Sequence, residues 1–108
     1  MSDNNTAKKH FQEGMTEFIG HNFDKIFDAL SRAIELKPDF KLARMSRGAA
    51  YLKMDKADGA VADFNKVIEL DPDYSKAFHL RGLAREKSGD DKTALYDFNK
   101  AIELDPEY

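Results

Sequence analysis

The chain has 108 residues, 42% of them hydrophobic and 11% aromatic, so it is long and apolar enough to bury the core of one small domain. Its 17 basic and 20 acidic residues are interspersed and give a net charge of −3, which excludes the basic surface that binds nucleic acids or anionic membranes. It has no cysteine, so disulfides, thiolate nucleophiles and cysteine metal sites are excluded as well.

The N-terminal segment has no features of a targeting signal. Residues 1–6 contain neither a basic region nor an apolar run, and we predict a flexible tail there. Nowhere does the sequence approach the roughly 18 consecutive apolar residues of a membrane-spanning helix. We therefore expect no membrane partner and a cytoplasmic location.

From residue 7 onward, the sequence repeats itself with a period of 34 residues. Residues 67–74 recur 34 residues later as 101–108, and a similar segment precedes them at 33–40. The windows 7–40, 41–74 and 75–108 align without gaps, and the second and third agree at 16 of 34 positions. Unrelated sequences would agree at about two positions, so the repeat is genuine.

Each window is predicted to contain two helices. In the second window, small and apolar residues recur at helical spacing in two segments separated by a break near residues 55–58. The prolines Pro38, Pro72 and Pro106 are expected to end the second helix of each window, because proline lacks the amide donor. The expected N-caps of these second helices are Asn22 or Asp24, Asp58, and Asp90 or Asp91.

A glycine recurs inside the first helix of every window, as Gly14, Gly48 and Gly82. Glycine costs about 1 kcal/mol relative to alanine there, so a packing reason is needed. Small residues recur on the second helix, as in Ala94 and Ala101 of the last window. We therefore expect the two helix backbones of a repeat to approach closely at the glycine.

These features together resemble the tetratricopeptide repeat: helix pairs of 34 residues, the glycine, the paired small residues, an aromatic residue such as Phe64 or Phe98, and a closing proline. The second and third windows resemble the subtype with an Arg-Gly pair, whereas the first has Glu13 before Gly14. The resemblance implies an all-α, right-handed superhelical solenoid of three antiparallel helix pairs, in a single domain covering residues 7–108. The RNA-reading pentatricopeptide family is the nearest competitor, but the strict 34-residue spacing and the acidic charge argue against it.

Two arginines stand among core-like positions, Arg47 and Arg81. Each is followed sixteen residues later by an aspartate, Asp63 or Asp97, whereas the first window has Glu13 and Ala29 at these places. Because a partly buried guanidinium requires a carboxylate partner, we predict structural ion pairs inside the second and third repeats.

The sequence contains no pattern typical of catalysis or metal binding. His10, His21 and His79 lack the spacing of metal-ligating histidines, and no glycine-rich phosphate loop follows a strand. We therefore expect no cofactor, no metal, no catalytic residue and no enzymatic activity.

The family resemblance places function on the first helix of each repeat, which lines the concave side of the superhelix and binds peptides. These helices carry a second apolar stripe, and a helix that is apolar on two faces has two partners. The candidate groove residues are Phe11, Met15, Phe18, Leu42, Met45, Ala49, Leu52, Lys76, His79 and Leu83. We expect a scaffold or adaptor that binds an amphipathic helix or an apolar peptide. Since groove residues are expected outside the core, Met45→Glu should weaken binding and leave the melting temperature nearly unchanged.

A carboxylate clamp of lysines, asparagines and an arginine is known in this family, where it holds the acidic C-terminus of a chaperone. The resemblance places the clamp positions of this chain at Phe11, Met15, Ser46, Lys76 and Leu80. Only Lys76 keeps the residue type of the clamp, so the sequence disfavours a co-chaperone role.

Self-association is the alternative function. The sequence stops at Tyr108 in full repeat register, and the second helix of the last window is more apolar than its own repeat can cover. We expect either another copy or further repeats of a parent protein to cover this edge, formed by Leu95, Tyr96, Phe98 and Ile102. Self-association through it should be weak and concentration-dependent.

Overall fold

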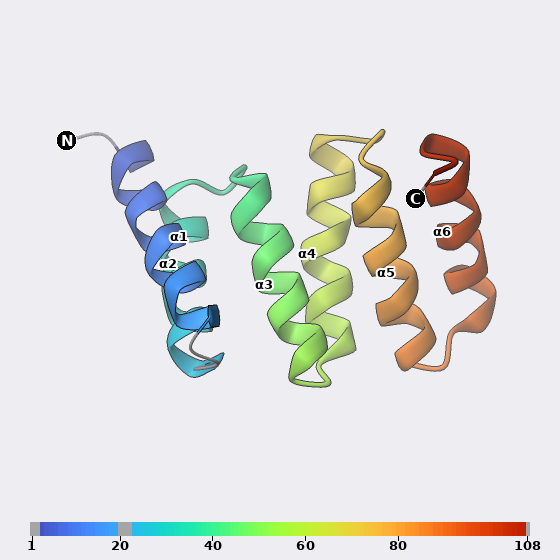
Figure 1. Ribbon diagram of the computed structural model, residues 1–108, viewed down its shortest axis with the longest axis horizontal. Helices are drawn as coiled ribbons and strands as arrows, with labels where there is room; N and C mark the ends of the chain where they lie inside the picture. The colour runs from blue at the N-terminus through green and yellow to red at the C-terminus, as the bar shows by residue number, and fades with distance from the viewer. Residues whose placement is uncertain (1–2, 20–22, 108) are drawn as a thin grey trace.

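The computed structural model describes residues 3–19 and 23–107, and these contain six α-helices and no strand. The helices are α1 (Asp3–Ile19), α2 (Phe23–Leu36), α3 (Lys41–Lys53), α4 (Ala57–Leu70), α5 (Ser75–Lys87) and α6 (Asp91–Leu104). They form three antiparallel pairs in a row, in a molecule that measures 43 × 25 × 22 Å (Figure 1). The predicted all-α class and the three helix pairs are confirmed.

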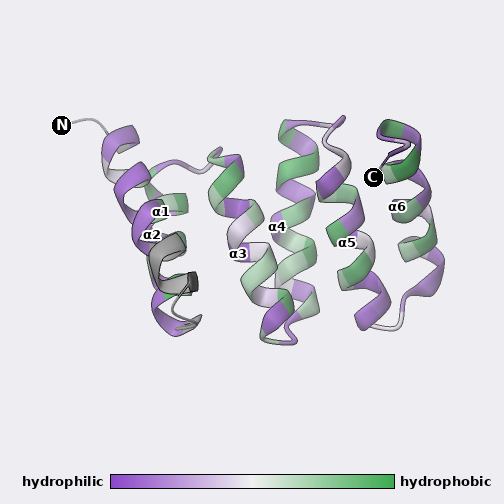
Figure 2. Ribbon diagram, viewed as in Figure 1, coloured by the Kyte–Doolittle hydropathy of each residue, from purple (hydrophilic) through white to green (hydrophobic). Residues whose placement is uncertain are grey.

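Each helix packs against the helices that precede and follow it in the chain, and α3 also contacts α5. The helices α4, α5 and α6 carry both hydrophobic and hydrophilic residues along their length, as amphipathic helices do (Figure 2). Contact between α3 and α5 places the first helices of neighbouring repeats side by side in one layer.

The core consists of two clusters, each of which joins one helix pair to the first helix of the next pair. The first cluster contains Ala7, Ile26, Leu30, Ala33, Ile34, Ala43 and Ala50. The second contains Met45, Leu52, Ala60, Phe64, Val67, Ala77 and Ala84. Because each cluster includes residues from two repeats, burial of apolar surface holds the repeats to one another.

The second helices end where the prolines predict. α2, α4 and α6 end at Leu36, Leu70 and Leu104, two residues before the proline in each case. The tail predicted for residues 1–6 is wrong for residues 3–6, which belong to α1, and residues 1 and 2 lie outside the described residues.

Of the predicted N-caps, Asp90 is correct and Asp58 is wrong. The Asp90 carboxylate accepts a hydrogen bond from the Thr93 backbone N–H at 3.4 Å, and hydrogen bonding by the side chain and then the backbone of Thr93 lowers the pKa of Asp90. Lys56 is the N-cap of α4, so Asp58 lies in the first turn. There its negative charge interacts favourably with the positive end of the helix dipole. Asp24 likewise lies in the first turn of α2, and Asn22 lies outside the described residues.

In the second and third repeats, the turn between the two helices contains one residue with a left-handed backbone conformation. Gly89 has φ 86° and Asp55 has φ 57°. Beyond Gly89, the backbone N–H of Asp90 donates to the carbonyl of Arg85 at 2.8 Å, and the equivalent bond joins Lys56 to Tyr51 at 2.8 Å. Both helices thus end in a Schellman motif.

We expect Gly89→Ala to lower the free energy of unfolding by about 1 kcal/mol, because an L-residue is disfavoured at positive φ. A Cβ built on Gly89 meets nothing within 4 Å, so the loss would come from the backbone alone. Urea denaturation measures it, and an unchanged midpoint would contradict the assignment of this turn.

The helical glycines have a packing reason different from the one predicted. A Cβ on Gly48 would lie 2.5 Å from Cε1 of Phe64, and a Cβ on Gly82 would lie 2.7 Å from Cε1 of Phe98. The space is thus taken by the aromatic ring of the second helix, and close approach of two backbones is not the cause. The packing around Gly14, the equivalent glycine of the first repeat, is not among the features that the structure describes.

Candidate functional site

The predicted ion pairs of Arg47 and Arg81 are present and internal. Arg47 donates from Nε and Nη2 to the two carboxylate oxygens of Asp63 at 2.8 and 2.7 Å. Arg81 holds Asp97 in the same way at 3.0 and 2.7 Å. Both aspartates are buried, so the two arginines act in the structure of the repeats and are not available as anion ligands.

Each buried carboxylate also binds a second arginine. Arg44 reaches Asp63 at 3.4 Å, and Arg85 reaches Asp97 at 2.8 Å. Arg81 also donates to Oδ1 of Asn65 on α4 at 2.9 Å, so it ties the third repeat to the second.

Hydrogen bonding to Asp63 raises the pKa of Arg47, with partial opposition from burial. A raised pKa means that the stabilising contribution is complete below the unfolded-state pKa of arginine and is lost only as the pH rises through the folded-state pKa. The charge of this arginine is therefore constant throughout the neutral range.

Two adjoining cavities lie between α3 and α5. The first has a volume of about 200 Å³ and is lined by Leu42, Met45, Ser46, Ala49, Tyr74, Lys76 and Leu80. The second has a volume of about 550 Å³ and is lined by Ala49, Leu52, Lys53, Asp55, Leu80, Leu83, Glu86 and Lys87. Because Ala49 and Leu80 line both, the two cavities adjoin at these residues, and we call them together the α3–α5 groove.

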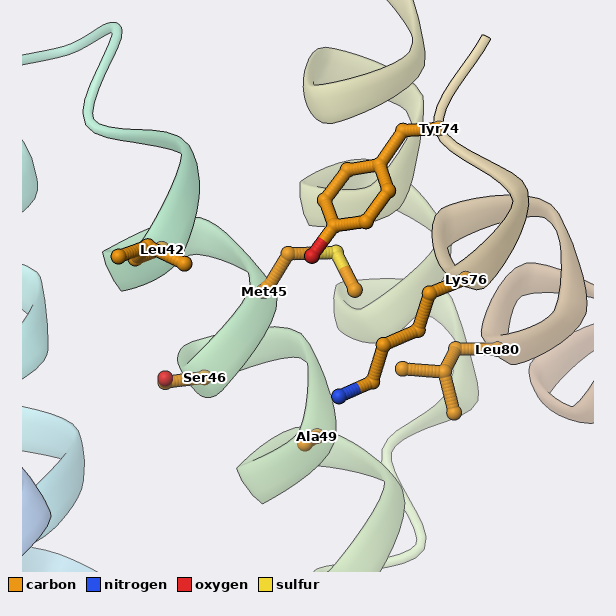
Figure 3. A pocket seen from close by; sticks show the side chains of 7 residues that line it. All are labelled: Leu42, Met45, Ser46, Ala49, Tyr74, Lys76 and Leu80. Carbon is orange, nitrogen blue, oxygen red and sulfur yellow. The ribbon is translucent and has the colours of Figure 1, made fainter. Parts of the chain in front are cut away.

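Side chains from both helices point into the first cavity. Lys76 and Leu80 extend from α5 toward Met45 and Ala49 on α3, and Tyr74 reaches over from the segment before α5 (Figure 3). Lys76 has no ion-pair partner among the residues that the structure describes. The cavity therefore combines an apolar floor with one available ammonium group.

The far end of the groove is more polar. Lys87 pairs with Asp55 at 3.7 Å across the mouth of the second cavity, and Lys53 and Glu86 line the same cavity. Leu52 and Leu83 supply its apolar lining. Both cavities are thus lined by apolar side chains, but the first adds one lysine and the second adds charged residues of both signs.

Six of the ten predicted groove residues line these cavities: Leu42, Met45, Ala49, Leu52, Lys76 and Leu83. Phe11 instead packs on the first core cluster, with its ring 5.2 Å from that of Phe40. His79 lies elsewhere too, because its ring faces Phe98 at 5.7 Å and lines neither cavity. The side chains of Met15 and Phe18 lie outside the described residues.

Met45 is both a groove residue and a core residue, which corrects the expectation that the two sets are separate. Its side chain is 6% exposed and belongs to the second core cluster. A glutamate at this position would bury a charge, so Met45→Glu would destabilise the fold and cannot test binding cleanly. Leu52 is buried in the same cluster.

Tyr74 and Leu80 both line the groove but were missing from the predicted groove residues. The repeat could have revealed Tyr74, because Phe40 and Tyr74 occupy equivalent positions, as do Phe11 and Met45. In the structure, Phe11 packs on Phe40, and Met45 lines a cavity with Tyr74. In the first two repeats, the closing residue therefore covers the first helix of the same repeat.

The described residues were also compared with the requirements of a metal site and of a membrane span. Within residues 3–19 and 23–107, no group of three or more histidine, aspartate or glutamate side chains could hold a metal ion. None of the described helices is both long and apolar enough to cross a membrane.

Comparison with protein families decides the assignment. Models of the tetratricopeptide repeat match residues 42–74 and 75–108. The chain belongs to the tetratricopeptide repeat family. Domains of this family are protein–protein interaction modules and are typically non-catalytic, in agreement with the absence of catalytic patterns in the sequence.

Solved tetratricopeptide repeat domains have the same fold. The first such domain of Spaghetti (RPAP3), bound to the HSP90 peptide SRMEEVD, superposes with a TM-score of 0.94 at 25% identity, over 99% of this chain and 85% of that one. The second domain of the same protein, with the same peptide, gives 0.88 at 31% identity over 93% of each chain. The Arabidopsis OM64 domain gives 0.94 at 26% identity, over 99% of this chain and 88% of its own. A comparison with curated proteins finds no match.

Proposed function

We propose that this tetratricopeptide repeat domain is a scaffold that binds an apolar peptide, or one face of an amphipathic helix, in the α3–α5 groove. The observation that carries the proposal is that two largely apolar cavities adjoin between α3 and α5 and share Ala49 and Leu80 in their linings. A bound peptide can therefore lie along the groove and place successive apolar side chains in both cavities.

Lys76 supports a ligand that carries a carboxylate beside its apolar side chains. Its ammonium group is available at the first cavity, and a carboxylate paired with it there is partly shielded from water by Tyr74 and Met45. Met45 adapts to different apolar groups, because its thioether chain is flexible and polarisable.

The acidic peptide SRMEEVD is bound by the two Spaghetti domains, and it suits this groove less well than an apolar peptide with one carboxylate. Of the positions that resemble the clamp, Ser46, Lys76 and Leu80 line the first cavity, and only the lysine is a cation. Phe11 is occupied in packing against Phe40. In the first cavity a ligand with several carboxylates would find only one cation, so we propose a predominantly apolar ligand.

A selection from a random 12-residue peptide library, displayed on phage and panned against the intact chain, tests this proposal. We expect the selected peptides to share apolar residues at helical spacing or in a short run, together with one acidic residue. Selection of peptides with several acidic residues, or tight binding of SRMEEVD, would instead support a carboxylate clamp and contradict the proposal.

A further inference from the structure

The outer face of α6 is apolar and uncovered. Leu95 and Ile102 are 60% and 55% exposed, and Asn99 lies between them on the same stripe of the helix. The equivalent residues of α4, Val61 and Ile68, are partly buried against the second core cluster, where α5 covers them. In the row of helices, α5 lies on one side of α6 and the other side is free (Figure 1).

The expected self-association edge needs one correction and one addition. Phe98 belongs to the interior of the third repeat, because its ring packs against Gly82 and His79. Asn99 was missed, although its equivalent Asn65 accepts a hydrogen bond from Arg81 of the neighbouring helix. In the second repeat, the amide at this position therefore faces α5, the helix that packs on α4.

Tyr96 extends the apolar surface on one flank of the stripe, and its side chain is 59% exposed. With 3.6 residues per turn, Lys92 and Glu103 lie on the same flank as Tyr96, one near each end of the helix. Lys92 has no ion-pair partner among the described residues, and Glu103 pairs only with Lys100 of its own helix at 3.6 Å. This flank of the face therefore has a positive end, an apolar middle and a negative end, whereas Asp91 lies in the first turn on the opposite flank.

We propose that this face binds a second copy of the chain, with the two α6 helices antiparallel about a two-fold axis near Asn99. Reversal of one helix brings Leu95 of each copy beside Ile102 of the other. It also brings each Lys92 to the Glu103 of the other copy, because both residues lie on the same flank. The two Asn99 amides meet near the axis, where each can donate and accept a hydrogen bond.

The interface is small, so the dimer is weak. Stable interfaces bury about 1,200–2,000 Å² in total, and three exposed apolar side chains on each copy fall short of that area. We expect monomer and dimer to exchange at concentrations on the order of 0.1–1 mM.

Charge reversal tests the antiparallel arrangement in the 108-residue chain, by sedimentation equilibrium between roughly 0.02 and 2 mM. Lys92→Glu or Glu103→Lys alone should each weaken dimerisation about tenfold, since both symmetric pairs become repulsive. The double variant should restore the wild-type dissociation constant to within about threefold. An equimolar mixture of the two single variants should also associate more strongly than either variant alone.

Three further variants serve as controls. Leu95→Glu should abolish the dimer while circular dichroism shows unchanged helicity, because Leu95 is exposed in the monomer. Lys8→Glu makes the same charge change as Lys92→Glu but at an exposed site on α1, at the opposite end of the row of helices from α6 (Figure 1), and it should have no effect. Ala49→Glu, which fills the α3–α5 groove, should leave the dimer intact, so this test is independent of peptide binding.

A chain that stays monomeric at 2 mM would overturn the proposal. So would a dimer that is indifferent to charge reversal, one that the double variant fails to restore, or one that Ala49→Glu abolishes.

Discussion

Asp97→Ala should lower the free energy of unfolding by about 3 kcal/mol, because removal of one partner from a buried ion pair leaves the other charge uncompensated. Asp97 is fully buried and holds two arginines, Arg81 in a bidentate pair and Arg85 at 2.8 Å. Both guanidinium groups would lose their carboxylate at once. Urea denaturation followed by circular dichroism measures the change.

The matched control is Asp71→Ala. Asp71 pairs with Lys41 at 3.2 Å, but both side chains are partly exposed, Lys41 at 45% and Asp71 at 38%. Exposed pairs of this kind contribute about 0–1 kcal/mol, so the control should cost far less than Asp97→Ala. If both variants lose the same small amount, the buried pairs have no structural role beyond that of the surface pair.

The second large effect is expected from Gly48→Ala, which should lower the free energy of unfolding by about 2 kcal/mol even though alanine favours helix by about 1 kcal/mol. The added methyl group would lie 2.5 Å from Cε1 of Phe64, a fully buried ring that cannot move aside without disturbing the core. Thermal unfolding of the variant gives the loss.

A double-mutant cycle with Phe64→Leu isolates the clash. Leucine stands at the equivalent position of the first repeat, as Leu30, so the fold accepts it there. Gly48→Ala should cost less in the Phe64→Leu background than in the wild type, since the ring that it strikes is gone. Strictly additive losses would show that contact with the ring does not explain the glycine.

The sequence predicts the fold well because the repeat supplies independent copies of the same signals. Three prolines at equal spacing set the helix ends, and the joint occurrence of Arg47 with Asp63, and of Arg81 with Asp97, predicts the internal pairs. Each signal reports a backbone or charge requirement that is local to one repeat.

The groove is predicted less completely, since helical periodicity does not separate neighbouring apolar stripes. Met45 and His79 occupy equivalent positions, yet Met45 lines the groove and the core together, whereas His79 turns toward Phe98. Side chain size and the partner on the next helix decide between these outcomes. Tyr74 was missed because it lies between helices, outside any periodic pattern.

The central claim is that the α3–α5 groove binds the ligand, and Ala49→Glu tests it most directly. Ala49 lines both cavities, so a glutamate there would occupy the place where they adjoin and put a charge on their apolar floor. Ala62→Glu is the control, because Ala62 is exposed on α4 and lines neither cavity.

The measurement is fluorescence anisotropy of a labelled peptide from the phage selection, titrated with wild type and both variants after their melting temperatures have been compared. We expect Ala49→Glu to weaken binding at least tenfold, equivalent to a loss of about 1.4 kcal/mol, and Ala62→Glu to change it less than twofold. Equal affinity of the wild type and a fully folded Ala49→Glu would place the binding surface outside the groove and contradict the account.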